Sequence, residues 1–346
     1  MFALPSNIRS QDLYTQKQLE RNIDQAIVKF QGEQYFAAIN ICNDIISKSP
    51  NEPLGYLGAA SIYHGIMRNY WTNSYHAEFD SLINLAVNIS ETRLNQNKEH
   101  AQYHFYYGAA RGIRGLQHLR QHEWFSAFRD GLIGYNHVKK AYQLDNTIYD
   151  AYLGLGLFYY WKSAKAKILT FLKFMKDERE KGIEYIKIAI NKGRFSILEG
   201  EMVLIQILLN EKRYEEALNE CQKIESNFSN DPTWLYLSAE ILMNLERWDE
   251  AKNYYLTLYK KLKNSKFTPC FGYMATCEYQ LAHCDFQLNE ISSAQEWIRK
   301  ATQTAQRRTS GLEIEGPLCA FEDTYTRIKL LQRKLEHISG VNSKSN

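Results

Sequence analysis

One short motif recurs four times along this chain and constrains its fold more than any other feature. In each copy an aromatic residue is followed three positions later by alanine, and in three copies a small or aliphatic residue stands twelve positions before that alanine. Small residues at this spacing let two helices approach closely, while the aromatic residues fill the gaps between them. The pattern therefore predicts a stack of antiparallel helix pairs. The copies are Tyr35–Ala38, Trp124–Ala127, Tyr214–Ala217 and Trp248–Ala251, and the earlier residues are Ala26, Ile205 and Ala239.

Two further stretches match the halves of a known repeat unit. Tyr152-x2-Leu155-Gly156-x2-Tyr159 resembles the front half of a tetratricopeptide repeat (TPR), and the spacing from Ala38 to Pro50 resembles its back half. We therefore predict an all-α fold, a right-handed α-solenoid of TPR-like antiparallel helix pairs with a C-terminal capping helix. We expect about seven repeats and about sixteen helices, with the most regular units at 197–230 and 231–264.

The predicted solenoid spans residues 12–338, between a flexible N-terminus at 1–11 and a disordered tail at 339–346. A chain of 346 residues exceeds what one compact core usually spans, but each repeat of a solenoid buries surface only against its neighbours. The first residues also resemble the end of a signal peptide whose earlier part is missing. The compartment is therefore left open: cytoplasmic as the chain is written, exported or periplasmic if residues 1–10 are such a remnant.

Composition excludes several classes of function. The net charge of +3 is too small to favour nucleic acid as a partner. No apolar run reaches the roughly 18 residues of a membrane span. None of the six cysteines forms a Cys-x2-Cys pair, so we expect buried free thiols and no metal site.

A longer stretch resembles one particular family. It begins at Tyr152–Tyr160 and continues through the leucine-rich run Lys167–Phe174, Asp177-x-Arg179-x2-Gly182-Ile183 and Leu204-x2-Ile207-Leu208. Over about residues 100–310 the chain resembles the Iml2/tetratricopeptide-repeat-39 family, although Lys176 stands where that family has a glycine. It also resembles bacterial TPR proteins that carry Gly108-Ala-Ala-Arg111-Gly112. The resemblance implies an all-helical repeat fold with an interaction or scaffold role, and it transfers no catalytic residue.

The run Gly108–Gly115 has the most unusual local composition. Glycine inside a helix costs about 1 kcal/mol relative to alanine, so several glycines indicate that a neighbouring helix approaches closely. Arg111 and Arg114, beside Tyr107, are also candidates for holding a carboxylate or phosphate in the groove. The alternative is that both arginines are internal ion-pair partners of an acid such as Asp130, Asp150 or Glu123.

The first helix of each pair is predicted to line a concave groove. Aromatic side chains in a pre-formed groove offer a large contact area at low entropic cost. We therefore expect a non-catalytic scaffold that binds a peptide or protein segment, without a cofactor and with its oligomeric state left open. The predicted groove residues are Leu153, Leu157, Tyr160, Trp161, Met202, Gln206, Tyr236 and Glu240.

Two alternatives stay open, and both involve the insertion at 162–176, which mixes lysines with apolar residues. It is a candidate lid over a small-molecule or enzyme site built on Tyr107–Arg114, and we expect it to fold back and narrow the groove near Arg111. It is also a candidate basic amphipathic contact with a membrane surface. A pocket with converging acids near Arg111 favours the first alternative, whereas an open and continuous groove favours the scaffold.

Overall fold

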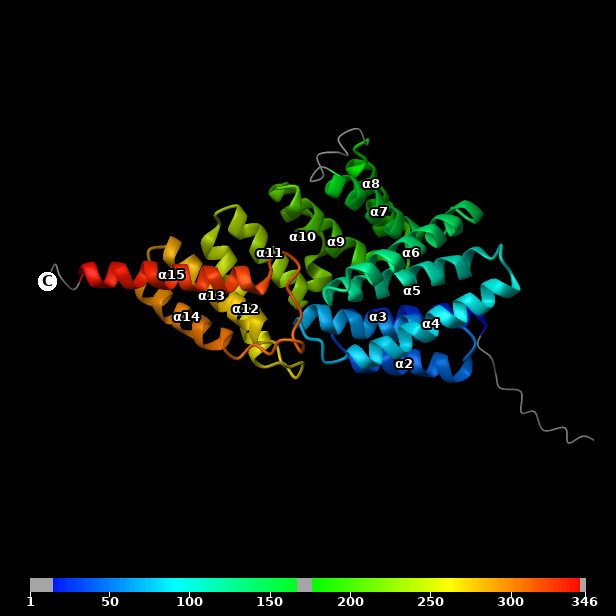
Figure 1. Ribbon diagram of the computed structural model, residues 1–346, viewed down its shortest axis with the longest axis horizontal. Helices are drawn as coiled ribbons and strands as arrows, with labels where there is room; N and C mark the ends of the chain where they lie inside the picture. The colour runs from blue at the N-terminus through cyan, green and yellow to red at the C-terminus, as the bar shows by residue number, and fades with distance from the viewer. Residues whose placement is uncertain (1–14, 167–175, 343–346) are drawn as a thin grey trace, which may run out of the picture.

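The computed structural model describes residues 15–166 and 176–342, which form fifteen α-helices (Figure 1). The first fourteen follow one another as antiparallel pairs, from α1 with α2 to α13 with α14, and α15 packs on the last pair. The predicted all-α solenoid is confirmed. The helices are α1 Gln16–Gln31, α2 Tyr35–Lys48, α3 Pro53–Tyr70, α4 His76–Gln96, α5 Ala101–Arg120, α6 Trp124–Leu144, α7 Ala151–Ala166, α8 Arg179–Lys192, α9 Ile197–Asn210, α10 Tyr214–Phe228, α11 Pro232–Asn244, α12 Trp248–Lys263, α13 Phe271–Gln287, α14 Ile291–Ala305 and α15 Phe321–Asn342.

Several predicted boundaries fall where the structure gives no description. The predicted flexible N-terminus at 1–11 and most of the insertion at 162–176 lie outside the described residues, so the expected fold-back of the insertion stays a prediction. Helix α15 continues to Asn342, past the predicted end of the solenoid at residue 338.

The same short turn joins the two helices in most pairs. The second residue after the first helix adopts a left-handed backbone conformation, with φ between 56° and 62°, and the second helix begins two residues later. The aromatic residue of each motif is the first residue of that second helix, in α2, α6, α10 and α12. The motif therefore marks where the second helix of a pair begins. The left-handed residues are Glu33, His122, Lys212, Glu246 and Asn289.

The alanines of the motif lie at helix crossings. Ala38, Ala217 and Ala251 are all 0% exposed, as expected for small residues where two helices approach closely. Ile205 and Ala239, twelve positions earlier, are also fully buried. The alanines set the distance between paired helices in α1–α2, α9–α10 and α11–α12.

Glycine replaces alanine where α5 meets α6. A Cβ atom placed on Gly108 would lie 2.8 Å from both the carbonyl oxygen of Gly134 and the amide nitrogen of Val138. Between α7 and α8, a Cβ on Gly156 would lie 2.7 Å from the carbonyl oxygen of Gly182. Real Cβ atoms do not approach backbone atoms so closely, so only glycine fits at these crossings. The close-approach interpretation of the Gly108–Gly115 run is confirmed at Gly108.

The motif at Trp124–Ala127 differs from the other copies. The Trp124 side chain is 62% exposed and Ala127 is only partly buried, because the α5–α6 contact runs through glycines and leaves no gap for the indole. The expectation that this aromatic fills a gap between helices is therefore wrong here. Phe125, Phe128 and Leu132 are exposed on the same helix.

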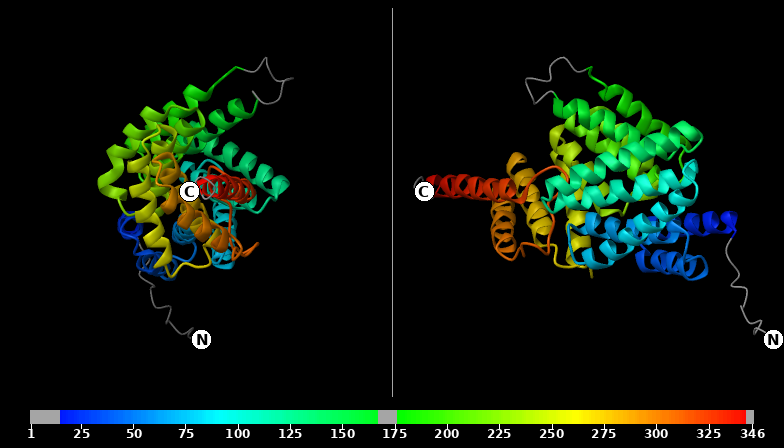
Figure 2. Two further views of the ribbon diagram at one scale, coloured as in Figure 1. Left: turned by 90° about the vertical axis from the view of Figure 1, so that its left-hand side faces the viewer. Right: turned by 45° about the vertical axis from the view of Figure 1, so that its right-hand side comes forward.

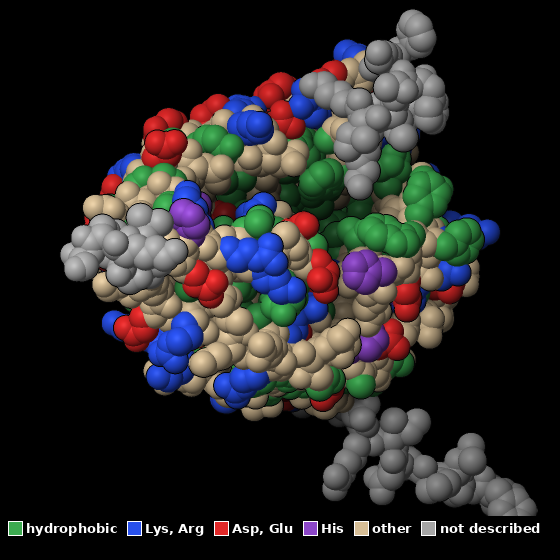
Figure 3. All heavy atoms as spheres, turned by 60° about the vertical axis from the view of Figure 1, so that its left-hand side comes forward, with side chains coloured by type: hydrophobic (Ala, Val, Ile, Leu, Met, Phe, Trp, Pro, Cys, Tyr) green, Lys and Arg blue, Asp and Glu red, His purple; other side chains and the backbone are tan. Residues whose placement is uncertain are grey.

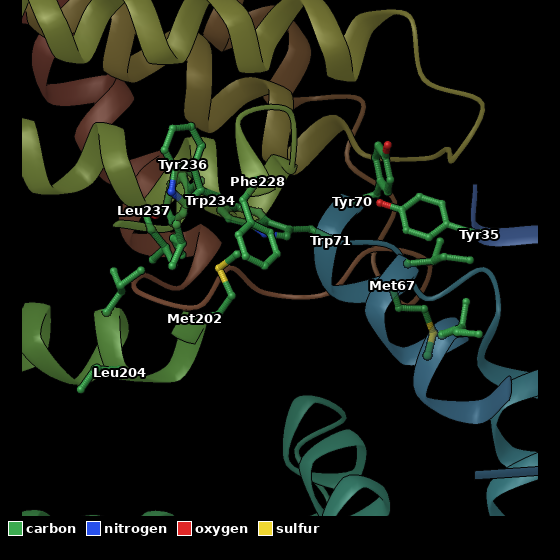
Figure 4. Packing of buried hydrophobic residues seen from close by; sticks show 14 of the residues in the cluster. Tyr35, Met67, Tyr70, Trp71, Met202, Leu204, Phe228, Trp234, Tyr236 and Leu237 are labelled. Atoms are coloured by element: carbon green, nitrogen blue, oxygen red, sulfur yellow. The ribbon is translucent and has the colours of Figure 1, made fainter. Parts of the chain in front are cut away.

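The stack curves far enough for its second helix pair to contact α11 and α13. Trp71, just after α3, stacks face to face on Tyr273 of α13 with ring centroids 3.7 Å apart. It also meets Tyr236 of α11 edge-on, and these two residues are labelled in Figure 4. Asn69 of α3 donates a hydrogen bond of 2.7 Å to Asp231, which caps α11. The expectation that only neighbouring repeats contact each other is therefore too simple.

The chain after α14 returns to the concave side. The amide of Asn73 donates to the carbonyl of Leu312 at 2.8 Å, and the amide of Ile314 donates to the carbonyl of Trp71 at 3.0 Å. Helix α15 packs against both α13 and α14. Seen end-on, α15 lies near the middle of the ring of helices (Figure 2, left). The predicted capping helix therefore also forms part of the concave surface.

Candidate functional site

A pocket of about 380 Å³ opens on the concave side of the solenoid. Its walls come from the first helices of four successive pairs, α7, α9, α11 and α13, and from the 317–319 segment and α15. Figure 3 shows the molecule from a direction in which its surface is hollowed, with hydrophobic and charged side chains around the hollow. The lining residues are Trp161, Gln206, Leu209, Asn210, Tyr236, Glu240, Asn244, Thr276, Tyr279, Gln280, Pro317, Leu318, Cys319, Thr324 and Arg327.

Polar side chains form a ladder across three of these helices. Each helix presents two of them four residues apart, which is one turn of helix and therefore one face. The exposed side chains of this polar ladder are Asn210 and Asn244, the last residues of α9 and α11. The full ladder is Gln206 and Asn210 on α9, Glu240 and Asn244 on α11, and Thr276 and Gln280 on α13.

Glu240 is the acidic group of the pocket. One of its oxygens, Oε1, accepts a hydrogen bond of 2.7 Å from the Gln280 amide and another from the Tyr255 hydroxyl. Burial raises the pKa of Glu240, and the hydrogen bonds from Tyr255 and Gln280 offset part of that rise. Arg327 on α15 acts on Glu240 through its charge without forming an ion pair with it among the described residues.

A second set of hydrogen bonds holds the Asn210 side chain in place. Asn210 donates a hydrogen bond of 2.7 Å to the Tyr160 hydroxyl, which in turn donates one of 2.9 Å to Glu211. Burial raises the pKa of Tyr160 to about 12, so this hydroxyl keeps its proton near neutral pH. The chain Asn210–Tyr160–Glu211 fixes the end of α9 against α7, and Arg179 closes it by forming an ion pair with Glu211.

Some of the predicted groove residues are exposed in the pocket, whereas others are buried beneath its surface. Trp161, Gln206 and Tyr236 line the pocket, and Trp161 is 43% exposed. Tyr236 and Tyr160 are only 1% and 0% exposed, so their rings support the pocket from beneath and offer little surface to a partner. Leu157 is partly buried on α7 and is not among the lining residues.

Tyr107, Arg111 and Arg114 lie apart from this pocket, on α5. Arg111 Nη1 donates to Asp130 Oδ1 at 2.8 Å, and Arg114 Nε donates to Asp130 Oδ2 at 2.6 Å. Arg114 Nη1 donates to Asn84 at 2.6 Å, and the Arg111 guanidinium lies 5.4 Å above the centre of the Tyr107 ring. The arrangement is the internal ion pair with Asp130 that the alternative interpretation predicts.

Sequence reasoning missed part of the pocket. Asn210 and Asn244 occupy the same position in consecutive units, so their recurrence is a signal that the sequence holds. Gln280 lies on α13, the first helix of the pair that follows α11 and α12, and it was not predicted. Arg327 carried no such signal, because it lies on α15, after the segment that returns to the concave side.

The remaining observations concern the cysteines, possible metal ligands and possible membrane helices. All six thiols are free and five are buried, as predicted; Cys319 is partly buried and lines the pocket. Across residues 15–166 and 176–342, no three His, Cys, Asp or Glu side chains gather as metal ligands would. No helix in the described part of the chain has the length and apolar character needed to cross a membrane.

Comparison with solved structures supports the fold. The chain superposes on one chain of the structure of the APC/C hetero-tetramer Cut9–Hcn1 with a TM-score of 0.58 at 13% identity, covering 95% of this chain and 51% of that one. The chain thus spans about half the length of that protein. No protein-family model matches the sequence, and neither does any curated protein.

Two smaller TPR proteins also match. YrrB, described as a TPR protein with an unusual peptide-binding site, gives a TM-score of 0.44 at 17% identity, covering 62% of this chain and 91% of that one. TTC0263, a thermophilic TPR protein from Thermus thermophilus, gives 0.42 at 16% identity, covering 65% and 99%. Of these three matches, the one to Cut9–Hcn1 has a TM-score above 0.5, and at 13% identity it concerns the fold alone.

Proposed function

We propose that this chain is a non-catalytic scaffold that holds an extended segment of a partner protein in the concave pocket. The observation that carries the proposal is the polar ladder. A peptide main chain presents alternating N–H donors and C=O acceptors, and Asn and Gln side chains pair with both. Trp161 and Leu318, 43% and 38% exposed, add apolar contact area beside the ladder.

The geometry does not favour a small-molecule or enzyme site at Tyr107–Arg114. Nε, Nη1 and Nη2 of Arg114 all donate to Asp130 or Asn84. Tyr107 is 5% exposed, and Arg111 is already paired with Asp130. A carboxylate or phosphate ligand would have to displace the buried Asp130 to reach these donors, which is costly.

Membership of the Iml2/tetratricopeptide-repeat-39 family and contact with a membrane both stay predictions. The family's interaction role agrees with a scaffold. The membrane contact was predicted for residues 162–176, most of which lie outside the described residues.

The test is a selection of short peptides displayed against the full chain, followed by affinity measurements on pocket variants. We expect Trp161→Ala and Asn244→Ala each to weaken the selected peptides by about ten-fold, because each removes an exposed contact of the pocket. Both variants should keep the wild-type helicity, since Trp161 is 43% exposed and Asn244, among the described residues, donates to the carbonyl of Glu240 within its own helix.

Asn219→Ala is the matched control, because Asn219 is exposed on α10 and does not line the pocket. Its peptide affinities should stay within about two-fold of the wild type. Peptides that bind the two pocket variants as tightly as the wild type, or a selection that yields no binder, would exclude the concave pocket as the binding site.

A further inference from the structure

The two charged side chains that line the pocket differ in how far they are buried. Glu240 is the acidic residue among the lining side chains and is partly buried, whereas Arg327, the basic one, is exposed on α15. Within the described part of the chain no ion pair to Glu240 occurs. A carboxylate facing a pocket without a paired cation attracts positive charge from a ligand.

The hydrogen bonds to Glu240 leave that attraction in place. Its Oε1 atom is held by two neutral donors, the Tyr255 hydroxyl and the Gln280 amide. Neutral donors orient the carboxylate but bring no compensating charge. Because Tyr255 is fully buried and Gln280 is 7% exposed, the carboxylate has a fixed position at the pocket wall.

We propose that the segment bound in this pocket inserts a lysine or arginine side chain whose cationic group pairs with Glu240. The inference rests on the proposed function, because it names the chemistry of the segment that the same pocket holds. A charge-assisted bond to a positioned carboxylate is stronger than one between neutral groups, and it offsets the desolvation of Glu240 on binding.

The rest of the pocket suits the shape of such a side chain. Lysine and arginine carry a long apolar stem, which packs along apolar surface while the charged end reaches a polar group. Trp161, Leu209 and Leu318 supply that surface, and the Trp161 indole also attracts a cation through its ring face. A volume of about 380 Å³ leaves room for the side chain and part of its main chain.

Arg327 makes the proposal testable, because its positive charge has opposite effects on the binding of a basic and of an acidic ligand. It lies close enough to influence both Glu240 and Tyr279 through its charge. It therefore repels an incoming cation and attracts an incoming anion. Removing its charge should strengthen the binding of a basic segment and weaken the binding of an acidic one.

The experiment titrates the full chain with short glycine-serine peptides that carry one central lysine, arginine, norleucine or glutamate. The readout is the NMR signal of the Trp161 indole N–H, assigned with Trp161→Phe. We expect the lysine and arginine peptides to bind at least about five-fold more tightly than the norleucine peptide. Glu240→Gln should remove that preference, and Arg327→Gln should increase lysine-peptide affinity by about two- to five-fold.

Arg333→Gln is the control for net charge, because Arg333 is exposed on α15 and does not line the pocket. It should leave all affinities unchanged. A thermal melt of Glu240→Gln checks that the variant is folded, and the exposed Arg327 gives a second variant that does not depend on it.

The outcomes separate the two proposals. Norleucine or glutamate peptides that bind as tightly as lysine, or weaker lysine binding in Arg327→Gln, would overturn the basic-segment inference while leaving the binding pocket in place. If none of the peptides moves the Trp161 signal at millimolar concentration, both the pocket function and the inference fail.

Discussion

Gly108→Ala should destabilise the protein by about 2 kcal/mol, although alanine is the better helix former. The new Cβ would lie 2.7 Å from Val138 Cγ2 and 2.8 Å from two backbone atoms of α6. The backbone atoms cannot move without shifting α5 away from α6 along the whole crossing. Overpacking typically costs about 1–3 kcal/mol, and contact with two backbone atoms places this cost at the upper end, so about 2 kcal/mol is left after the gain of about 1 kcal/mol in helix propensity.

Gly112→Ala and Gly115→Ala, on the same helix, are the matched controls. A Cβ on Gly112 would meet no atom within 4 Å, so this change should leave stability unchanged or raise it by up to about 1 kcal/mol. On Gly115 the nearest atom would be the Ala127 carbonyl oxygen at 3.2 Å, which predicts an intermediate effect. Urea unfolding followed by circular dichroism measures all three. Equal midpoints for Gly108→Ala and Gly112→Ala would show that the helices do not cross at Gly108.

The features that the sequence predicted are those set by neighbours along the chain. The aromatic that opens the second helix, the alanine buried three residues later and the glycine contact at Gly108 all act within one helix pair. Their spacing is therefore visible as a repeat. The copy at Trp124 misled for a related reason: the motif marks where the helix begins, but the glycines of α5–α6 leave no gap for the ring.

The features that the sequence could not predict depend on the curvature of the whole stack. Nothing in the repeat indicates that Trp71 meets Tyr273, or that Asn69 pairs with Asp231. Part of the pocket has the same origin, because Arg327 lines it only where α15 returns to the concave side. Trp161 and Gln206 were predicted since they belong to regular first helices, whereas Arg327 follows a loop whose course no periodicity fixes.

The buried charges of α5 and α6 give the second large effect. Asp130→Ala should lower the free energy of unfolding by about 3 kcal/mol or more. Asp130 is 0% exposed and pairs with both Arg111 and Arg114, whose side chains are 15% and 13% exposed. Without it two nearly buried guanidinium groups lose their charge partner, and among the described residues Arg111 Nε already has no hydrogen-bond partner. Urea unfolding of the variant and the wild type measures the difference.

Arg129→Ala is the control, since the 54% exposed Arg129 lies 3.9 Å from the same carboxylate and should change stability by less than about 0.5 kcal/mol.

Urea unfolding of arginine variants also tests the role of Arg111 and Arg114. If they are internal partners of Asp130, Arg111→Ala and Arg114→Ala should each cost more than about 1 kcal/mol, because each leaves part of a buried carboxylate unpaired. Their peptide affinity, measured below the unfolding transition, should equal that of the wild type. Weaker peptide binding by these two variants at unchanged stability would instead show that both arginines contact the partner. Their ion pairs with Asp130 would then have to break when the partner binds.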